Sequence, residues 1–173
     1  MLHRGAARLA VAGLAAASCL TLITAPAQAA TGTPSVVARK DVPNNCPRSG
    51  RFTWWMTTTT TGTCTSLDNG KLYFAMSQIQ EKAKRQKLRV VYDKRGGSTA
   101  KIALGYKQAN KLHWTKARSV KKGQAVDFTW RGQKNKFQPS RGYLKMYTSS
   151  GTKTYQTPLF KCDGPAGCPV LGW

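Results

Sequence analysis

The stretch that decides the fold is residues 101–107, which reads KIALGYK. Its large apolar side chains, Ile102, Leu104 and Tyr106, occupy every second position, with charged or small residues between them. Because successive side chains of a β-strand point to opposite faces, this alternation predicts a strand with one buried face. The same alternation recurs at residues 52–56, 72–76, 88–92, 126–130 and 144–146.

Short turn motifs separate these alternating runs. Glycine and small polar residues favour chain reversals, so consecutive strands are expected to run antiparallel. The sequence therefore predicts an all-β fold, a small antiparallel β-sandwich or barrel. Residues 77–87 are the one place where a helix is considered, and a short helix and a loop both remain open there. The turn motifs lie at residues 68–70 (DNG), 96–98 (GGS), 121–123 (KKG) and 149–151 (SSG).

Residues 1–29 have the composition of a secretory signal peptide. Two arginines precede an apolar stretch at residues 9–23, and the small residues Ala27 and Ala29 suit signal peptidase. We therefore expect cleavage after Ala29 and a secreted, extracellular protein with no transmembrane segment in the mature chain. A retained membrane helix and a lipoprotein modified at Cys19 are the alternatives.

The remaining chain divides into a lead-in and one domain. Residues 30–45 are polar and contain proline and asparagine, so we expect a flexible lead-in. Within it, residues 36–38 (VVA) suit a short strand, either in the domain itself or donated to a partner. Residues 46–173 have the length of a single β domain.

Four cysteines, Cys46, Cys64, Cys162 and Cys168, follow the signal peptide. An even number of cysteines in an exported chain predicts two disulfides, with three possible pairings. Spacing favours Cys46–Cys64 and Cys162–Cys168, the second of which would close a C-terminal loop. No cysteine pair has the short spacing of a zinc site, so we expect no metal.

The charge of the chain is strongly one-sided. There are 28 Lys and Arg residues against 6 Asp and Glu, a formal net charge of +22. Such an excess weakens the compact state by self-repulsion, and it favours an anionic partner. We expect secreted proteins or anionic cell-surface polymers as partners. The candidate contact residues are Lys82, Lys84, Arg85, Lys87, Arg89, Lys121 and Lys122.

Aromatic residues lie among these basic residues, a pattern compatible with nucleic acid. Tyr106 and Trp130 fall on the inward positions of their strands, however, so we expect them to pack in the core. Trp114 and Tyr143 are the others in this group. No motif supports specific nucleic-acid binding. Two further candidates for aromatic contact with a partner are Trp55 and Trp173.

The sequence carries few residues suited to catalysis. After the signal peptide it contains one glutamate, Glu81, and one histidine, His113, with no spacing signal between them. Phosphate-binding and dinucleotide-binding glycine patterns are absent, as is the nucleophile elbow of hydrolases. We therefore expect no catalytic residues, no cofactor and no enzymatic activity.

The alanine-rich leader and the Thr/Lys/Gly-rich mature chain resemble small secreted β-proteins of filamentous actinobacteria. Within that group the extended lead-in and the four cysteines are similar to the adaptor subunit of the secreted umbrella toxin particles. The resemblance implies a non-enzymatic subunit that joins a toxin to lectin subunits.

Three hypotheses of function follow. The first is an adaptor or structural subunit of a secreted toxin or antibacterial assembly, held by strand addition or insertion of the lead-in. The second is a basic module that binds the cell envelope or another polyanion, with an antimicrobial role. The third is a small extracellular hydrolase or an inhibitor of one. We favour the first on the sequence.

Overall fold

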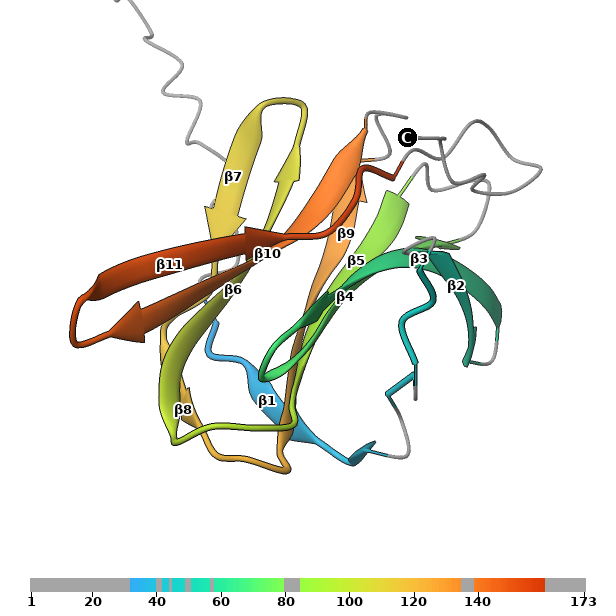
Figure 1. Ribbon diagram of the computed structural model, residues 1–173. Coiled ribbons are helices and arrows are strands. Elements are labelled where there is room, and N and C mark those ends of the chain that lie inside the picture. Colours follow the sequence, from blue (N-terminus) through green and yellow to red (C-terminus); the bar gives the residue numbers. More distant parts are fainter. Residues whose placement is uncertain are drawn as a thin grey trace, which may run out of the picture.

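The computed structural model of the protein describes residues 32–39, 42–43, 45–48, 51–56, 58–79, 85–134 and 139–160 (Figure 1). Within these ranges the chain forms eleven β-strands and no α-helix. The predicted all-β fold is therefore confirmed. No helix long and apolar enough to cross a membrane occurs in the described ranges.

The strands form two antiparallel sheets that pack face to face as a sandwich (Figure 1). The six-stranded sheet has the order β1-β9-β5-β4-β3-β2, and the five-stranded sheet has the order β11-β10-β6-β7. Both β7 and β8 pair with β6, on the edge that β10 does not occupy. The first sheet consists of β1 (Ser35–Val37), β2 (Arg51–Met56), β3 (Thr58–Leu67), β4 (Gly70–Ile79), β5 (Arg85–Lys94) and β9 (Ala125–Lys134). The second consists of β6 (Ala100–Gln108), β7 (Lys111–Trp114), β8 (Arg118–Val120), β10 (Ser140–Thr148) and β11 (Gly151–Gln156).

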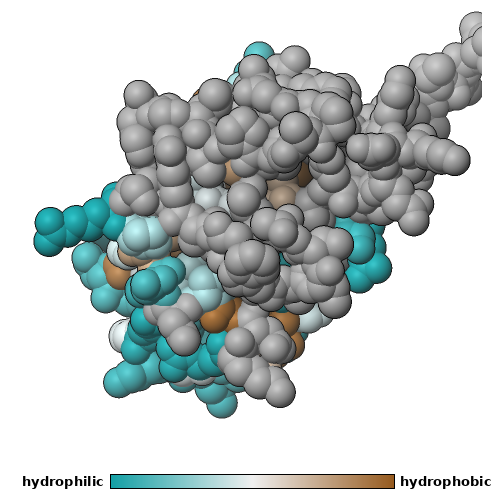
Figure 2. Space-filling model, turned by 90° about the vertical axis from the view of Figure 1, so that its right-hand side faces the viewer, coloured by the Kyte–Doolittle hydropathy of each residue, from teal (hydrophilic) through white to brown (hydrophobic). Residues whose placement is uncertain are grey.

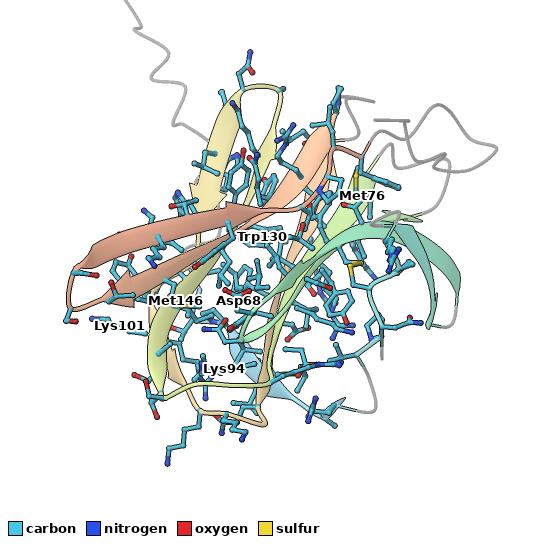
Figure 3. All side chains as sticks on the ribbon, viewed as in Figure 1. Asp68, Met76, Lys94, Lys101, Trp130 and Met146 are labelled. Atoms are coloured by element: carbon cyan, nitrogen blue, oxygen red, sulfur yellow. A yellow bond between two sulfur atoms is a disulfide. The ribbon has the colours of Figure 1, made fainter. Side chains whose placement is uncertain are left out.

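The main core lies between the two sheets, and the alternating residues of the sequence fill it. Ile102, Leu104 and Tyr106 on β6 are buried, and the labelled side chains of Trp130 and Met146 lie between the sheets (Figure 3). The ring centroids of Tyr106 and Trp130 are 4.8 Å apart, so the two rings join β6 to β9. The predicted core positions of Tyr106 and Trp130 are thereby confirmed.

A second, smaller cluster covers the other face of the six-stranded sheet. Tyr73, Val91 and Ala125 point away from the main core, and Val42 packs against them. The hydroxyl of Tyr73 donates a hydrogen bond of 2.7 Å to the carbonyl oxygen of Pro43. Because this sheet is covered on both faces, Leu72 to Met76 are all buried, the inward and the outward positions alike.

The lead-in, within which we expected a short strand at residues 36–38, is partly built into the fold. Ser35–Val37 forms β1 and pairs with β9, with Val36 opposite Val126. The guanidinium of Arg39 contacts the buried carboxylate of Asp93, with Nε 3.2 Å from Oδ1. The short apolar run of β1 and the burial of Val42 hold this segment on the domain.

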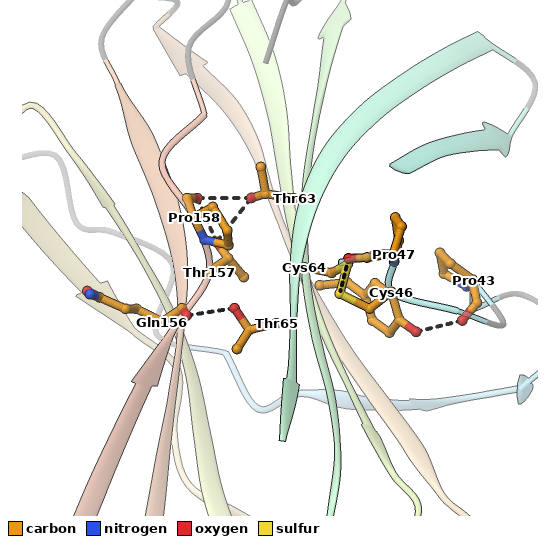
Figure 4. The surroundings of a disulfide bond; sticks show 10 residues. Pro43, Cys46, Pro47, Thr63, Cys64, Thr65, Gln156, Thr157 and Pro158 are labelled. Atoms are coloured by element: carbon orange, nitrogen blue, oxygen red, sulfur yellow. Dashed lines mark hydrogen bonds between the residues drawn. A yellow bond between two sulfur atoms is a disulfide. The ribbon is translucent and has the colours of Figure 1, made fainter. Parts of the chain in front are cut away.

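The disulfide Cys46–Cys64 is present, which confirms the first predicted pairing (Figure 4). It joins the end of the lead-in to β3 beside the second cluster, against which Cys46 also packs. Cys162 and Cys168 lie outside the described residues, so their disulfide and the C-terminal loop stay predictions.

Hydrogen bonds from threonines close one side of the sandwich. The hydroxyl of Thr63 on β3 donates to the Pro158 carbonyl oxygen at 3.0 Å, and that of Thr65 donates to the Gln156 carbonyl oxygen at 2.9 Å (Figure 4). These contacts join the six-stranded sheet to the end of β11. They fix the position of Gln156 and of the segment that follows it.

Residues 77–87, where we weighed a helix against a loop, contribute to strands at both ends. β4 runs to Ile79 and β5 begins at Arg85, with Ser77 opposite Lys87. The polar side chains of this segment hid the strand period because they interrupt the apolar alternation. Residues 80–84 lie outside the described part of the chain.

Candidate functional site

The outer face of the five-stranded sheet carries cations and aromatic rings in adjacent rows. Since Ile102, Leu104 and Tyr106 fill the core, the residues between them point outward. The register places outward residues of β6 directly opposite outward residues of β10, and Gly105 opposite Trp114 of β7. We call this surface the aromatic–cationic face; it consists of Lys101, Lys107, Trp114, Arg141, Tyr143, Lys145 and Tyr147.

The rings of this face contact its cations and one another. The Nζ atom of Lys145 lies over Trp114, 4.5 Å from the ring centroid, and that of Lys101 lies 5.9 Å from the centroid of Tyr147. Trp114 and Tyr143 meet edge to face, with centroids 6.0 Å apart. Cation–π contacts orient flexible lysine side chains, so these ammonium groups are held in place before a ligand arrives.

Gly105 makes room for the Trp114 ring. A Cβ atom built on Gly105 would lie 2.6 Å from Cε3 of Trp114 and 2.7 Å from the carbonyl oxygen of His113. The ring therefore packs directly against the backbone at the centre of β6, and its distance from the sheet depends on the absence of a side chain at Gly105.

The described acids lie elsewhere. Asp93 accepts a hydrogen bond of 2.6 Å from Nε of Arg95, and Asp127 accepts one of 2.6 Å from Nε of Arg89. Both carboxylates belong to the six-stranded sheet, and the third described acid, Asp68, lies in the turn between β3 and β4. The five strands of the other sheet contain no Asp or Glu at all. Among the described residues, therefore, no carboxylate is paired with a cation of the aromatic–cationic face.

A shallow pocket of about 520 Å³ opens at one end of this face. Lys107, Arg141, Tyr143 and Gln156 line it, together with apolar atoms of Leu159. Its rim includes the two-residue turn between β6 and β7. In that turn both Ala109 (φ 47°) and Asn110 (φ 63°) adopt the left-handed conformation.

The basic residues singled out from the sequence do not form one site. Lys82 and Lys84 lie outside the described residues, and only the backbone of Arg85, the first residue of β5, is described. Arg89 is paired with Asp127 and therefore neutralised. The remaining residues of the set are Lys87, at a register shift between β5 and β9, and the exposed Lys121 and Lys122.

Lys121 and Lys122 lie far along the sheet from the other predicted basic residues. They immediately precede Gly123, whose amide donates to the carbonyl oxygen of Lys94 at the end of β5. Arg85 and Lys87 are at the beginning of that same strand. A strand rises by about 3.3 Å per residue, so roughly 25 Å separates the two groups.

The aromatic candidates divide into two groups. Trp114 and Tyr143 lie on the aromatic–cationic face, although sequence reasoning gave them no role there. Trp55 belongs to β2, opposite Thr59, with its side chain outside the described part; Trp173 is also outside it. The signal for the face was present in the alternation itself, because the outward positions of residues 101–107 and 141–147 are mostly basic or aromatic.

His113 packs against a residue of the core. Its ring stacks on Tyr106 with centroids 4.6 Å apart, and burial, followed by the nearby charge of Lys111, lowers the pKa of the imidazole. Glu81, its only sequence candidate for a partner, lies outside the described residues. Among the described side chains, no group of three or more His, Cys, Asp or Glu residues is arranged to hold a metal ion.

Comparisons with models of protein families, with curated proteins and with solved structures found no match to this chain. Function is therefore argued from the chemistry of the aromatic–cationic face and its pocket. This arrangement can attract, orient and hold an anionic ligand.

Proposed function

We propose that this protein is a secreted, non-enzymatic binding protein that holds an anionic glycan or polyol polymer of a cell surface on its aromatic–cationic face. One observation carries the proposal. Four cations and three aromatic rings share the outer face of a sheet whose strands contain no acid. A face of one sign of charge attracts a polymer of the opposite sign and concentrates it there.

The aromatic rings favour a sugar or polyol over a nucleic acid. A base needs a free ring face on which to stack. Trp114 instead rests on Gly105, carries the ammonium of Lys145 and meets Tyr143 edge to face. The part of the ring face that stays open is smaller than a base, and it suits the smaller apolar C–H surface of a sugar or polyol unit.

The neighbouring strand supplies polar groups of the kind that bind hydroxyls. In β11, Thr152, Thr154 and Gln156 are exposed and stand opposite Tyr147, Lys145 and Tyr143, so they lie on the same face. Hydroxyl and amide groups both donate and accept hydrogen bonds, as a polymer rich in hydroxyls requires.

The leader-like residues 1–29 support export of this protein. The Cys46–Cys64 disulfide is compatible with an oxidising compartment. Anionic wall polymers are among the polyanions that a protein meets outside the cell. The proposal thus takes up the second hypothesis drawn from the sequence.

The adaptor hypothesis has less support from the described residues. One of its two routes, insertion of the lead-in into a partner, needs a free lead-in, whereas Ser35–Val37 pairs with β9 of its own domain. Among the described residues, the side of the molecule that bears β2 and β3 is mainly hydrophilic, with hydrophobic residues in small separate places (Figure 2). The described residues visible on that side therefore form no large apolar patch.

The test compares two double variants that lose the same charge. Lys101→Gln with Lys145→Gln removes two cations of the face, and Arg48→Gln with Arg131→Gln removes two exposed cations on the outer side of the six-stranded sheet. Purified protein is sedimented with cell walls that retain their anionic polymers. We expect the first variant to lose about tenfold in affinity, and wild-type binding to fall as salt screens the charges.

The control variant should lose less than about threefold, because its arginines act only through the net charge. Equal losses in the two variants would show that the face is not the binding surface. Binding to single-stranded DNA as tight as binding to wall polymer would contradict the choice of a glycan or polyol.

A further inference from the structure

Lys107 and Arg141 are direct neighbours across β6 and β10, and both point outward into the pocket. Like charges in opposed positions of a sheet repel each other. Neither side chain has an ion-pair or hydrogen-bond partner among the described residues, and no acid lies in either strand. This unneutralised pair is the arrangement that a bound anion would stabilise.

The walls of the pocket are suited to more than a bare ion. Tyr143 and Gln156 are opposite each other on β10 and β11 and offer a ring, a hydroxyl and an amide. Pro139 and Leu159 add apolar surface on the other side. At about 520 Å³ the pocket has room for an anionic group together with one sugar or polyol unit attached to it.

The hairpin turn at the rim places a residue other than glycine in the left-handed conformation. A two-residue turn with both residues left-handed is ordinarily occupied by Asn-Gly or Gly-Gly. Here Ala109 takes the first position at φ 47°, although its Cβ disfavours that conformation. Backbone strain of this kind is concentrated at binding sites, and Ala109 and Asn110 both line the pocket.

We infer that this pocket is a subsite for a phosphate group esterified to a sugar or polyol. The inference rests on the proposed function and names the group that the polymer presents. The planar fork of Arg141 matches two phosphate oxygens, and Lys107 adds a point charge beside it. The sugar or polyol unit then lies against Tyr143, with the amide of Gln156 at its hydroxyls.

The test uses glycerol 3-phosphate as the probe, titrated into the purified protein and followed by NMR chemical shifts. We expect saturable shifts for residues that line the pocket and about a tenfold weaker dissociation constant for Arg141→Gln. Arg141→Lys keeps the charge but loses the planar fork of the guanidinium, so its affinity should lie between those of the wild type and of Arg141→Gln. Lys121→Gln also removes one charge, at the opposite end of β6, so it serves as the charge-matched control and should bind as the wild type does.

Each result decides one claim. Any of three results would overturn the phosphate subsite. They are that glycerol binds as tightly as glycerol 3-phosphate, that glucuronate binds as tightly as glycerol 3-phosphate, or that Arg141→Gln leaves the affinity for glycerol 3-phosphate unchanged. If the probe fails while wall polymer is still retained through Lys101 and Lys145, the subsite is wrong and the proposed function stands. If the probe binds but wall polymer does not, the pocket stands and the proposed function is wrong.

Discussion

The indole ring of Trp114 lies against the bare backbone of Gly105, so a Cβ atom on Gly105 would be 2.6 Å from Cε3 of the ring. We predict that Gly105→Ala displaces Trp114 and weakens polymer binding, because Lys145 is oriented over that ring. It should also destabilise the fold by about 1–3 kcal/mol, since the carbonyl oxygen of His113 is equally close. Cell-wall sedimentation and urea denaturation measure the two effects.

Gly142→Ala is the matched control for this variant. Gly142 stands on β10 opposite Tyr106 and faces the core, where an added Cβ would be 2.8 Å from Cβ of Phe74. It should lower the free energy of unfolding by a similar amount and leave binding by the folded protein unchanged. If both alanine variants lose binding equally, the position of Trp114 does not govern the face.

The Cys46–Cys64 disulfide holds the lead-in on the outer side of the six-stranded sheet, where Val42 covers Tyr73 and Val91. We predict that replacing both cysteines by serine lowers the free energy of unfolding by about 3 kcal/mol. The bridge spans a sequence separation of 18, and closing a loop of that size removes entropy from the unfolded chain. Urea denaturation of the double variant measures the loss.

Reduction of the wild-type protein provides the comparison. A larger loss on reduction than in the double variant is expected, because the predicted Cys162–Cys168 bridge would be broken as well. Equal losses would contradict that second bridge. A double variant as stable as the wild type would show that the lead-in is held by its other contacts alone.

Three buried tyrosines predict a loss of stability in alkaline solution. Burial raises the pKa of Tyr73, Tyr92 and Tyr106 from the ordinary 10.0 to about 12 in each case. Between these values the unfolded chain releases the phenolic protons while the folded chain keeps them. Their contribution to stability is therefore complete below pH 10 and is lost as the pH rises towards 12.

Denaturation curves collected from about pH 9 to about pH 12, with tyrosinate absorbance recorded in parallel, test this expectation. The free energy of unfolding should decrease steadily across the upper part of that range, and these phenols should ionise together with unfolding. A constant free energy of unfolding from pH 10 to pH 12 would contradict the burial of these hydroxyls.

The sequence predicted the core well because the buried residues of a strand recur at every second position. Leu88, Val90 and Tyr92, like Ile102 and Leu104, alternate with residues of other kinds, and all of them are buried between the sheets. The alternation did not predict the burial of Val91 and Ala125, which lie in the second cluster. Their burial depends on the lead-in covering that face, and no local pattern reports such a long-range contact.

The candidate site was predicted less well because charge was counted along the chain and not across the sheet. Lys145 and Trp114 are 31 positions apart in the numbering, yet β6 lies between their strands and the two side chains touch. Conversely, Arg89 belongs to the densest basic run but is neutralised by Asp127 on the neighbouring strand. Register between strands decides which charges meet, and a count of charges along the chain carries no information on register.

His113 predicts a loss of stability in mild acid. Burial against Tyr106, and secondarily the charge of Lys111, lowers the pKa of the imidazole below its ordinary 6.5. Below pH 6.5 the unfolded chain therefore binds a proton that the folded chain does not yet bind. The contribution of His113 to stability is complete above pH 6.5 and is lost as the pH falls towards the folded pKa.

The His113→Phe variant tests this prediction because it keeps a ring on Tyr106 and removes the titrating group. The decrease in Tm between about pH 7 and about pH 5 should be smaller in the variant than in the wild type. The other histidine of the chain, His3, lies in the predicted signal peptide, so protein prepared without residues 1–29 would give a single imidazole signal whose NMR titration reports the folded pKa directly. A midpoint at or above 6.5, or equal decreases in Tm for both proteins, would show that stacking on Tyr106 does not hold the imidazole in its neutral form.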